Sequence, residues 1–346
     1  MRALVLEVVE VDEKGFRKFV AEGKRVPPNL SESTIRQNIR TVKEFETLLR
    51  KRNAKKVFSN ATANDVKAFV RQQNKKKADM WTNHLGLLRY SRFAGNEEVE
   101  LALLLMLDGY DVLGKLTEAV VKEIGRKKSK RILKGFKLPE IGTSPKRFPK
   151  VTKEFMNRLE SNLDQHTCRR ILLTGVHAGP PEYYLDEKKM LRESKNVDEY
   201  LSKRRKKLIK ELSEHMKNDT LFFTQRIDKK SLDFVKKNPE VAGGVRKGDR
   251  IFQTKIPYMM IECLGEKDPT MRRYYYCHCP LARESILSGL KISQDFCYCS
   301  AGYEKRPYEV AFGEPVETEV LQSVLWGDPV CRFAMRIPKK YLAGKL

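Results

Sequence analysis

The chain has 346 residues, with 69 Lys and Arg against 45 Asp and Glu, which gives a formal net charge of +24 at pH 7 and a pI near 9.7. Its longest apolar run, 101–107, is far shorter than the roughly 20 residues of a membrane span, and no N-terminal stretch has the order of a secretory signal. We therefore expect a cytoplasmic, multidomain protein without a membrane partner, whose charge attracts polyanions such as nucleic acid.

The N-terminal part combines helical patterns with basic residues. After an arm over residues 1–25, Ser31 is suited to cap a helix with apolar residues at spacings of three and four, and Thr62 with Asp65 predicts a capping box for a second helix. A third helical pattern covers about 80–93, so we predict an all-α bundle over 26–125. Its expected contacts with DNA are Arg36, Arg40, Lys43, Lys75, Lys76, Lys77, Arg89 and Arg92.

Within this bundle, the caps and apolar positions of residues 26–95 form a distinct pattern. It is carried by Leu30-Ser31, Ser33-Thr34-Ile35, Phe45, Leu48-Leu49, Thr62, Asp65-Val66, Phe69 and the stretch 83–93. This pattern resembles the core-binding, SAM-like domain of tyrosine recombinases and phage integrases. The resemblance implies a small helical domain that clamps duplex DNA through its backbone. A helical bundle used for protein contact is the alternative.

Recombinase catalysis is not expected, although His166-Thr167-Cys168-Arg169 has an HxxR spacing. A tyrosine recombinase needs two arginines, a lysine and a nucleophilic tyrosine, and no downstream tyrosine has a suitable context. The run 274–276 of three tyrosines precedes a cysteine and is expected to belong to the fold around it.

Residues 126–150 are the most basic segment, with ten Lys and Arg against the single acid Glu140. Prolines, glycine and serine in 139–149 are typical of a linker. We interpret the segment as a basic linker that can follow a phosphate backbone, with a merely solvated linker as the alternative. The further predicted DNA contacts are Arg126, Lys127, Lys128, Lys130 and Arg131.

From residue 151 onward, helical and strand patterns alternate. Helices are predicted over 155–173 and 197–216, a hairpin over 245–256, and two strands over 315–326 and 330–337. The region 151–346 is therefore predicted to be an α+β domain with a terminal antiparallel pair.

Two cysteine couplets give the strongest chemical signal: Cys277 with Cys279, and Cys297 with Cys299. Residues two apart in an extended segment point to the same side, so each couplet can aim two thiols at one point. Four thiols suit a tetrahedral zinc ion or an iron–sulfur cluster, and zinc is favoured. We predict one zinc ion held by these four residues, with 281–292 as the helical connection. Because the one-residue spacing is unusual for zinc, disulfides or buried thiols stay as the alternative.

The blocks 221–225, 276–280 and 297–302 resemble an uncharacterised prokaryotic domain family. The segment 327–333 is similar to the close of vinyl-4-reductase-type and aminothiazoline-carboxylate-hydrolase-type domains. The resemblance implies a module that binds a metal or a small-molecule ligand.

Other cysteines and histidines have weaker expectations. Cys331 could join the couplets as a ligand or a resolving thiol if the last strand crosses the same sheet. His278 is expected to face away from the thiols. His177 precedes a Gly-Pro-Pro turn and is expected to be structural, although it could meet Cys168 in space.

These features favour a DNA-binding protein whose second domain binds metal, responds to redox state or takes a small ligand. The alternative is a small-molecule enzyme, hydrolase-like or reductase-like, with a basic helical appendage. A third hypothesis is an interaction module with a structural cysteine site.

Overall fold

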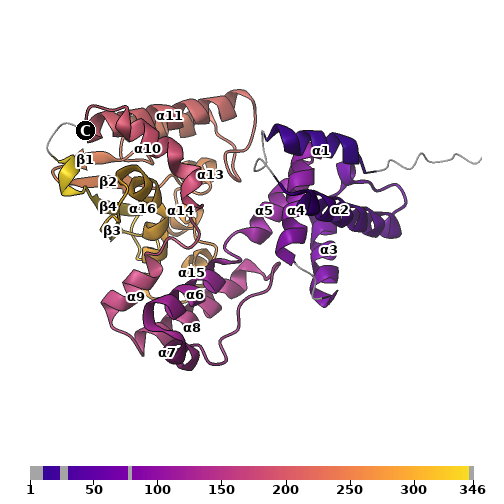
Figure 1. Ribbon diagram of the computed structural model, residues 1–346, viewed down its shortest axis with the longest axis horizontal. Helices are drawn as coiled ribbons and strands as arrows, with labels where there is room; N and C mark the ends of the chain where they lie inside the picture. Colours follow the sequence, from indigo (N-terminus) through magenta and orange to yellow (C-terminus); the bar gives the residue numbers. More distant parts are fainter. Residues whose placement is uncertain (1–10, 24–29, 77–79, 343–346) are drawn as a thin grey trace, which may run out of the picture. The chain divides into compact units, whose positions relative to one another are not determined.

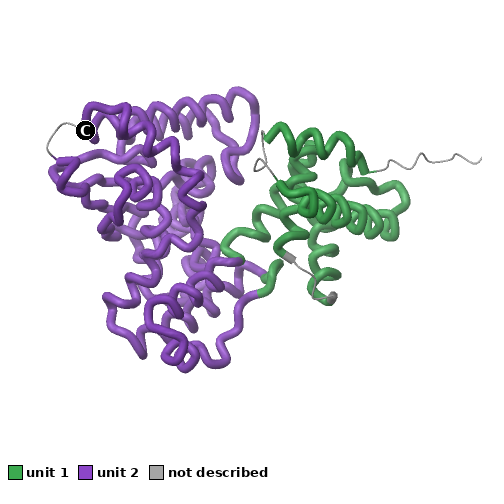
Figure 2. The backbone as a smooth tube through the Cα atoms, viewed as in Figure 1, with its two compact units in different colours: residues 1–110, 140–143 green, residues 111–139, 144–346 purple. Residues whose placement is uncertain are grey.

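The structure, a computed structural model, describes residues 11–23, 30–76 and 80–342 and is mostly helical (Figure 1). The chain forms two compact units (Figure 2): unit 1 comprises 1–110 with 140–143, and unit 2 comprises 111–139 with 144–346. A helical N-terminal part is thus followed by a part that contains helices and a sheet, as expected. The division differs from the expected boundaries at 125 and 150, because 111–139 belongs with the second unit.

Unit 1 is a helical bundle around an aromatic core. The Ser31 hydroxyl caps its longest helix by accepting from the Thr34 amide at 3.2 Å, and Phe45 on that helix lies edge-on against Phe58 and Phe69. Ile141 returns to this core and is buried. The described elements are α1 Glu13–Glu22, α2 Glu32–Arg52, η1 Phe58–Asn60, α3 Ala63–Lys76, α4 Met80–Ala94 and α5 Glu97–Leu107. Helix α1 lies within the segment that was expected to be an arm.

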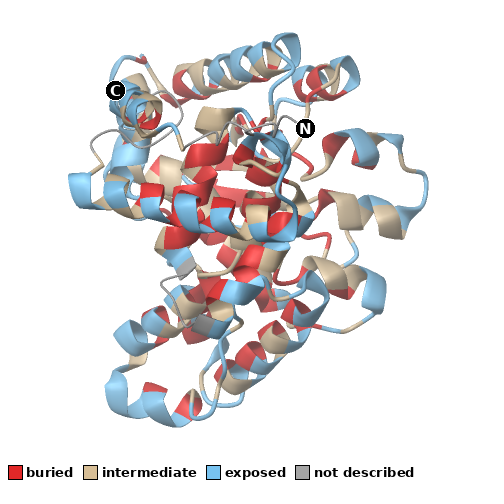
Figure 3. Ribbon diagram, turned by 90° about the vertical axis from the view of Figure 1, so that its right-hand side faces the viewer, coloured by how far each residue is buried: buried red, intermediate tan, exposed pale blue. Residues whose placement is uncertain are grey.

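Unit 2 has its own cores, with buried residues on the inner faces of its helices (Figure 3). Its helices are α6 Val112–Ile124, α7 Arg126–Ile132, η2 Pro145–Arg147, α8 Phe148–Glu160, α9 Gln165–Leu172, η3 Pro181–Tyr184, α10 Leu185–Arg192, α11 Val197–Lys217, α12 Lys229–Lys237, α13 Met260–Gly265, α14 Pro269–Tyr276, α15 Arg283–Ser288, η4 Gln294–Cys297, α16 Tyr298–Phe312 and η5 Lys339–Tyr341. No helix in the described ranges is long and apolar enough to cross a membrane.

The sheet of unit 2 has four antiparallel strands in the order β1-β2-β4-β3. The strands are β1 Val245–Lys247, β2 Arg250–Thr254, β3 Thr318–Gln322 and β4 Arg332–Arg336. The predicted hairpin and terminal pair are both present. Phe333, Ala334 and Met335 of β4 are all buried, so this central strand is covered on both faces.

Two local predictions were wrong. The helix expected over 155–173 is interrupted, because the Asp164 carboxylate accepts from the Thr167 amide and caps a new helix, α9. The predicted linker 126–150 contains α7 and the start of α8, and Ser129 and Ile132 of α7 are buried.

Candidate functional site

The first cysteine couplet lies where α14 ends. Cys277 is the extended C-cap residue of that helix and is only 5% exposed. The carbonyl of Cys279 accepts from the amides of Ala282 and Arg283, which lead into α15. Burial raises the pKa of Cys277, and the neighbouring thiols of Cys279 and Cys331 raise it further. Cys277 itself has the extended backbone that the sequence predicted.

The second couplet is helical, which changes where its thiols point. Cys297 ends η4 and Cys299 lies in the first turn of α16. Residues two apart on an α-helix differ by about 200° in direction, so they face opposite sides. Cys297 Sγ lies 2.9 Å from Ser323 Oγ, whereas Cys299 Sγ lies 3.6 Å from His177 Nδ1. The expectation that Cys297 and Cys299 aim at one point was therefore wrong.

Cys331 occupies the neighbourhood that Cys299 was expected to fill. Its carbonyl accepts from the Lys255 amide at 3.0 Å, which ties it beside the end of β2. Burial raises the pKa of Cys297, and the thiols of Cys331, Cys277 and Cys279 raise it further. We call Cys277, Cys279, Cys297 and Cys331 the thiol cluster.

The thiol cluster has polar neighbours of its own. The Ser323 hydroxyl and the Val324 amide both act to lower the pKa of Cys331, although burial raises it overall. As arranged in the described part of the chain, no three His, Cys, Asp or Glu side chains form a group that could hold a metal ion. The zinc prediction therefore stays a prediction.

A separate contact joins Cys299 to His177. The loop that carries His177 approaches α16 closely, because a Cβ on Gly302 would lie 2.8 Å from the Gly175 amide nitrogen. The His177 ring consequently stacks on Tyr303, with centroids 5.0 Å apart and an interplanar angle of 2°. Burial, helped by Lys255, lowers the pKa of His177 to about 3, and burial raises the pKa of Cys299 to about 12. The pair is a neutral imidazole beside a protonated thiol.

Lys255 is a buried cation whose charge acts on Cys331 and on the pair of Cys299 and His177. Its Nζ lies 3.0 Å from Ser300 Oγ and 3.2 Å from Glu304 Oε1. Burial would lower the pKa of Lys255, but the Glu304 carboxylate more than offsets this and raises it. The Lys255 and Glu304 side chains are only 9% and 11% exposed, so this ion pair is largely shielded from solvent.

The polar contacts continue from Glu304 through the interior of unit 2. Gln253 bonds to Glu304 and to the Tyr308 hydroxyl, and the same hydroxyl accepts from Arg204. Arg204 in turn pairs with Glu187 at 2.9 Å. Periodicity identified α11 but carried no signal for this buried arginine, because its partners come from distant elements.

The other predicted residues lie apart from these thiols. Cys168 is buried on α9, where burial raises its pKa to about 11, and its described neighbours do not include His177. The His278 ring packs on Tyr258 and its Nε2 bonds to the Ile256 carbonyl. One ring nitrogen of His278 is thus already bonded to the backbone.

The predicted DNA contacts of unit 1 fall into two groups. Arg36, Arg40 and Lys75 are exposed, and Arg36 pairs with Glu32 at 3.8 Å. Lys43 pairs with Glu13 and Arg92 pairs with Glu100 at 2.9 Å, while Arg89 is partly buried against Asn38. Nothing is described for the Lys76 side chain, and Lys77 lies outside the described residues.

Helix α7 carries five exposed cations in seven residues: Arg126, Lys127, Lys128, Lys130 and Arg131. Arg158 of α8 holds this helix in place by donating to the carbonyls of Ile132 at 3.1 Å and Lys134 at 2.8 Å. None of the ten basic residues in 126–150 pairs with a carboxylate among the residues that the structure describes, and all ten are exposed.

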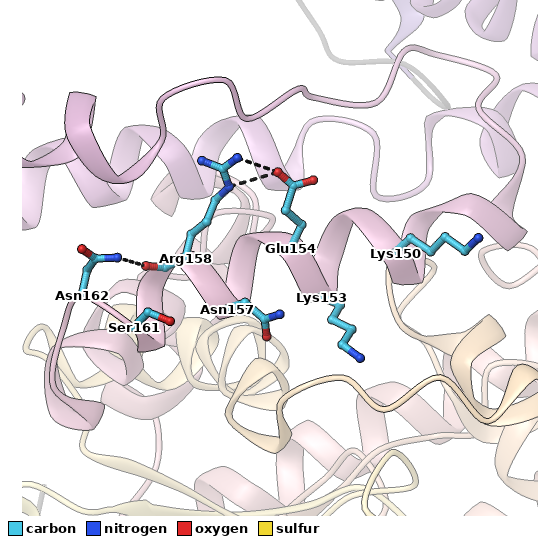
Figure 4. Close-up of a pocket in the computed structure, with 7 residues that line it drawn as sticks. All are labelled: Lys150, Lys153, Glu154, Asn157, Arg158, Ser161 and Asn162. Carbon is cyan, nitrogen blue, oxygen red and sulfur yellow. Dashed lines mark hydrogen bonds and ion pairs between the residues drawn. The ribbon is translucent and has the colours of Figure 1, made fainter.

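A shallow groove of about 480 Å³ lies along α8 (Figure 4). Lys150, Lys153 and Asn157 line it, and Arg158 is bonded there to Glu154 at 2.7 Å. The basic character of the segment thus extends from α7 onto α8.

The second basic run of the chain, 203–207 on α11, is different. Lys203 pairs with Glu199 at 3.0 Å and Lys207 with Asp186 at 3.0 Å, and Arg204 is buried with Glu187. Arg205 donates to the Lys236 carbonyl. Most side chains of this run therefore already make contacts within the protein.

Comparison with known proteins gives one match, between residues 264–342 and a family of unknown function (DUF6144). This segment contains five of the seven cysteines, including the whole thiol cluster. No curated protein and no solved structure matches the chain. The resemblances to recombinase, vinyl-4-reductase-type and hydrolase-type domains stay predictions.

Proposed function

We propose that this protein binds duplex DNA through the phosphate backbone, with α7 as its principal contact. The observation that carries the proposal is the set of ten exposed basic residues in 126–150, which have no described carboxylate partner. Unpaired cations can neutralise phosphates without first breaking an internal ion pair, and each phosphate neutralised releases counterions. Contact with the backbone alone carries little sequence preference.

Unit 1 adds contacts in this proposal, as a helical domain similar to a core-binding domain. The support is limited to the exposed side chains of Arg40 and Lys75, because the exposed Arg36 already pairs with Glu32 at 3.8 Å. Lys43 and Arg92 already have carboxylate partners, so they contribute less than the sequence suggested.

The test measures binding of a short duplex to the full chain over a range of salt concentrations. In one variant, glutamine replaces Arg126, Lys127, Lys128, Lys130 and Arg131. We expect affinity to fall about tenfold or more at moderate salt, and the slope of log affinity against log salt to decrease by up to about 4.5, at about 0.9 per phosphate. The decrease should be similar on unrelated sequences.

A charge-matched control separates α7 from the overall charge of the protein. In it, glutamine replaces five exposed lysines of α10 and α11: Lys188, Lys189, Lys206, Lys210 and Lys217. We expect this control to bind much like the wild type. Equal loss in both variants, or no binding by the wild type at low salt, contradicts the proposal.

The alternative of a small-molecule enzyme has one supporting observation, the contact of 3.6 Å between Cys299 and His177. A nucleophilic cysteine acts as its thiolate. Burial raises the pKa of Cys299 to about 12 and lowers that of His177 to about 3. At neutral pH this pair is therefore a thiol and a neutral imidazole, and not a thiolate and an imidazolium. DNA binding is therefore the function that we favour.

A further inference from the structure

We propose that Cys277, Cys279, Cys297 and Cys331 hold one zinc ion in a four-thiolate site, and that Cys299 is not a ligand. The proposal is independent of DNA binding. It differs from the set expected from the sequence by exchanging Cys299 for Cys331, which lies directly before the last strand.

The ligand segments converge in unit 2. Cys277 and Cys279 follow α14, Cys297 precedes α16, and Cys331 precedes β4. Cys277 belongs to a small apolar cluster against which Cys279 and Cys331 pack. Three connections that are distant in sequence therefore deliver thiols to one buried region.

Ser323 links the two thiols that come from different elements. Its hydroxyl is 2.9 Å from Cys297 Sγ, and the next residue, Val324, belongs to the apolar cluster against which Cys331 packs. Hydrogen bonds from hydroxyl and amide groups to ligand sulfurs are typical of the outer shell of metal–thiolate sites.

The donor set favours zinc. Four cysteine thiolates form a closed tetrahedral structural site for zinc, with bonds of about 2.3 Å. The thiols do not stand at that spacing in the described structure, where no group of three could ligate an ion. Binding therefore requires rotation of cysteine side chains toward a common centre and displaces the thiol protons.

A buried cation also lies beside the proposed ligands. Four thiolates and one Zn²⁺ carry a net charge of about −2. Lys255 is a buried cation that interacts with the thiol of Cys331. It is tied there through its amide, which donates to the Cys331 carbonyl. A fixed cation beside the cluster would partly balance that charge.

Cys299 is excluded by the geometry of its helix. Its sulfur faces His177, on the opposite side of the helix from the contact between Cys297 and Ser323. To reach the thiol cluster, Cys299 would have to unwind the first turn of α16. This residue is therefore the matched control for the test.

The experiment begins with the full reduced chain, purified without an affinity metal and analysed for bound zinc and iron. We expect about one zinc per chain in the wild type. Cys331→Ser should lose at least half of the bound zinc, whereas Cys299→Ser should retain it. A characteristic visible absorption with bound iron would overturn the assignment of zinc in favour of an iron–sulfur cluster.

A measurement on the wild type keeps the test decisive if Cys331→Ser does not fold. Each cysteine's alkylation rate is measured by mass spectrometry with zinc added and with a chelator present. We expect the chelator to speed modification of the four cluster thiols and to leave Cys299 slow. The proposal is overturned if the wild type neither contains nor takes up zinc, or if Cys299 responds to the chelator as Cys331 does.

Discussion

At the scale of single residues, the side chain of Asp65 illustrates how a local motif becomes a stabilising contact. Its carboxylate accepts from the amide of Thr62 at 3.0 Å and from the hydroxyl of Thr62 at 2.8 Å, and it also pairs with Lys56. Burial would raise the pKa of Asp65, but these bonds outweigh burial and lower it below its ordinary value of 3.8.

This pKa gives a prediction about stability and pH. The unfolded chain binds the Asp65 proton more readily than the folded chain, so this stabilisation is present above about pH 4 and is lost as the pH falls through the lower folded pKa. Asp65→Asn should destabilise unit 1 by about 1–3 kcal/mol at pH 7, with a smaller difference near pH 3. Urea unfolding at both pH values measures this difference in stability, with hydrogen exchange in α3 as the readout for unit 1. A difference that grows toward low pH would contradict this account.

Single residues also show what the sequence could predict about the site. The couplet of Cys277 and Cys279 and the Asp65 motif were identifiable because they depend on residues a few positions apart. The exchange of Cys299 for Cys331 depends on whether 297–299 is extended or helical. The sequence of three residues does not determine whether they are extended or helical, because tertiary packing determines it.

At the scale of elements, α16 is positioned by a close backbone contact. Gly302 lies so near the loop after α9 that a Cβ there would be 2.9 Å from the Leu173 carbonyl carbon and oxygen. This approach sets the position of His177 above Tyr303. The two glycines at the contact, Gly175 and Gly302, had no periodic signal that could have predicted it.

The prediction for this contact uses two glycine substitutions. Gly302→Ala should destabilise unit 2 by about 1–3 kcal/mol, because backbone atoms must move to accept the methyl group. Gly265→Ala is the control, since a Cβ on this glycine of α13 meets no atom within 4 Å. Urea unfolding should show a lower midpoint for the first variant only, and equal midpoints would refute the contact.

Helix α7 shows why composition alone misassigned an element. Its five cations and the prolines that follow are typical of a linker, yet Arg158 binds the end of the helix from 26 positions away. Such a partner is invisible to a reading of local sequence. The helices α2 and α11, by contrast, were predicted well because their apolar residues recur regularly.

At the scale of the whole molecule, the two units have separate hydrophobic cores. Phe45 belongs to the core of unit 1 and Phe155 to a core of unit 2, and both are fully buried. Helix α6 belongs to unit 2, although the sequence placed it in the first domain.

Reciprocal truncations test this division. Phe45→Ala and Phe155→Ala should each cost about 3–5 kcal/mol in the affected unit. Hydrogen exchange on the full chain should quicken in α2 and α4 for the first variant, and in α6 and α16 for the second. Faster exchange of α6 in Phe45→Ala, without a change in Phe155→Ala, would restore the boundary at 125.

The strand order of the sheet has a consequence for biosynthesis. Strand β4 lies between β2 and β3, and Thr254 of β2 pairs with Arg332. At about 5–20 residues per second, translation leaves β2 without this neighbour for roughly 4–16 s. Cys277, Cys279 and Cys297 are all made before Cys331, so the nascent protein carries an open sheet edge and three incompletely covered thiols. Synthesis of one short segment, Cys331 with β4, then covers both the sheet edge and the thiols.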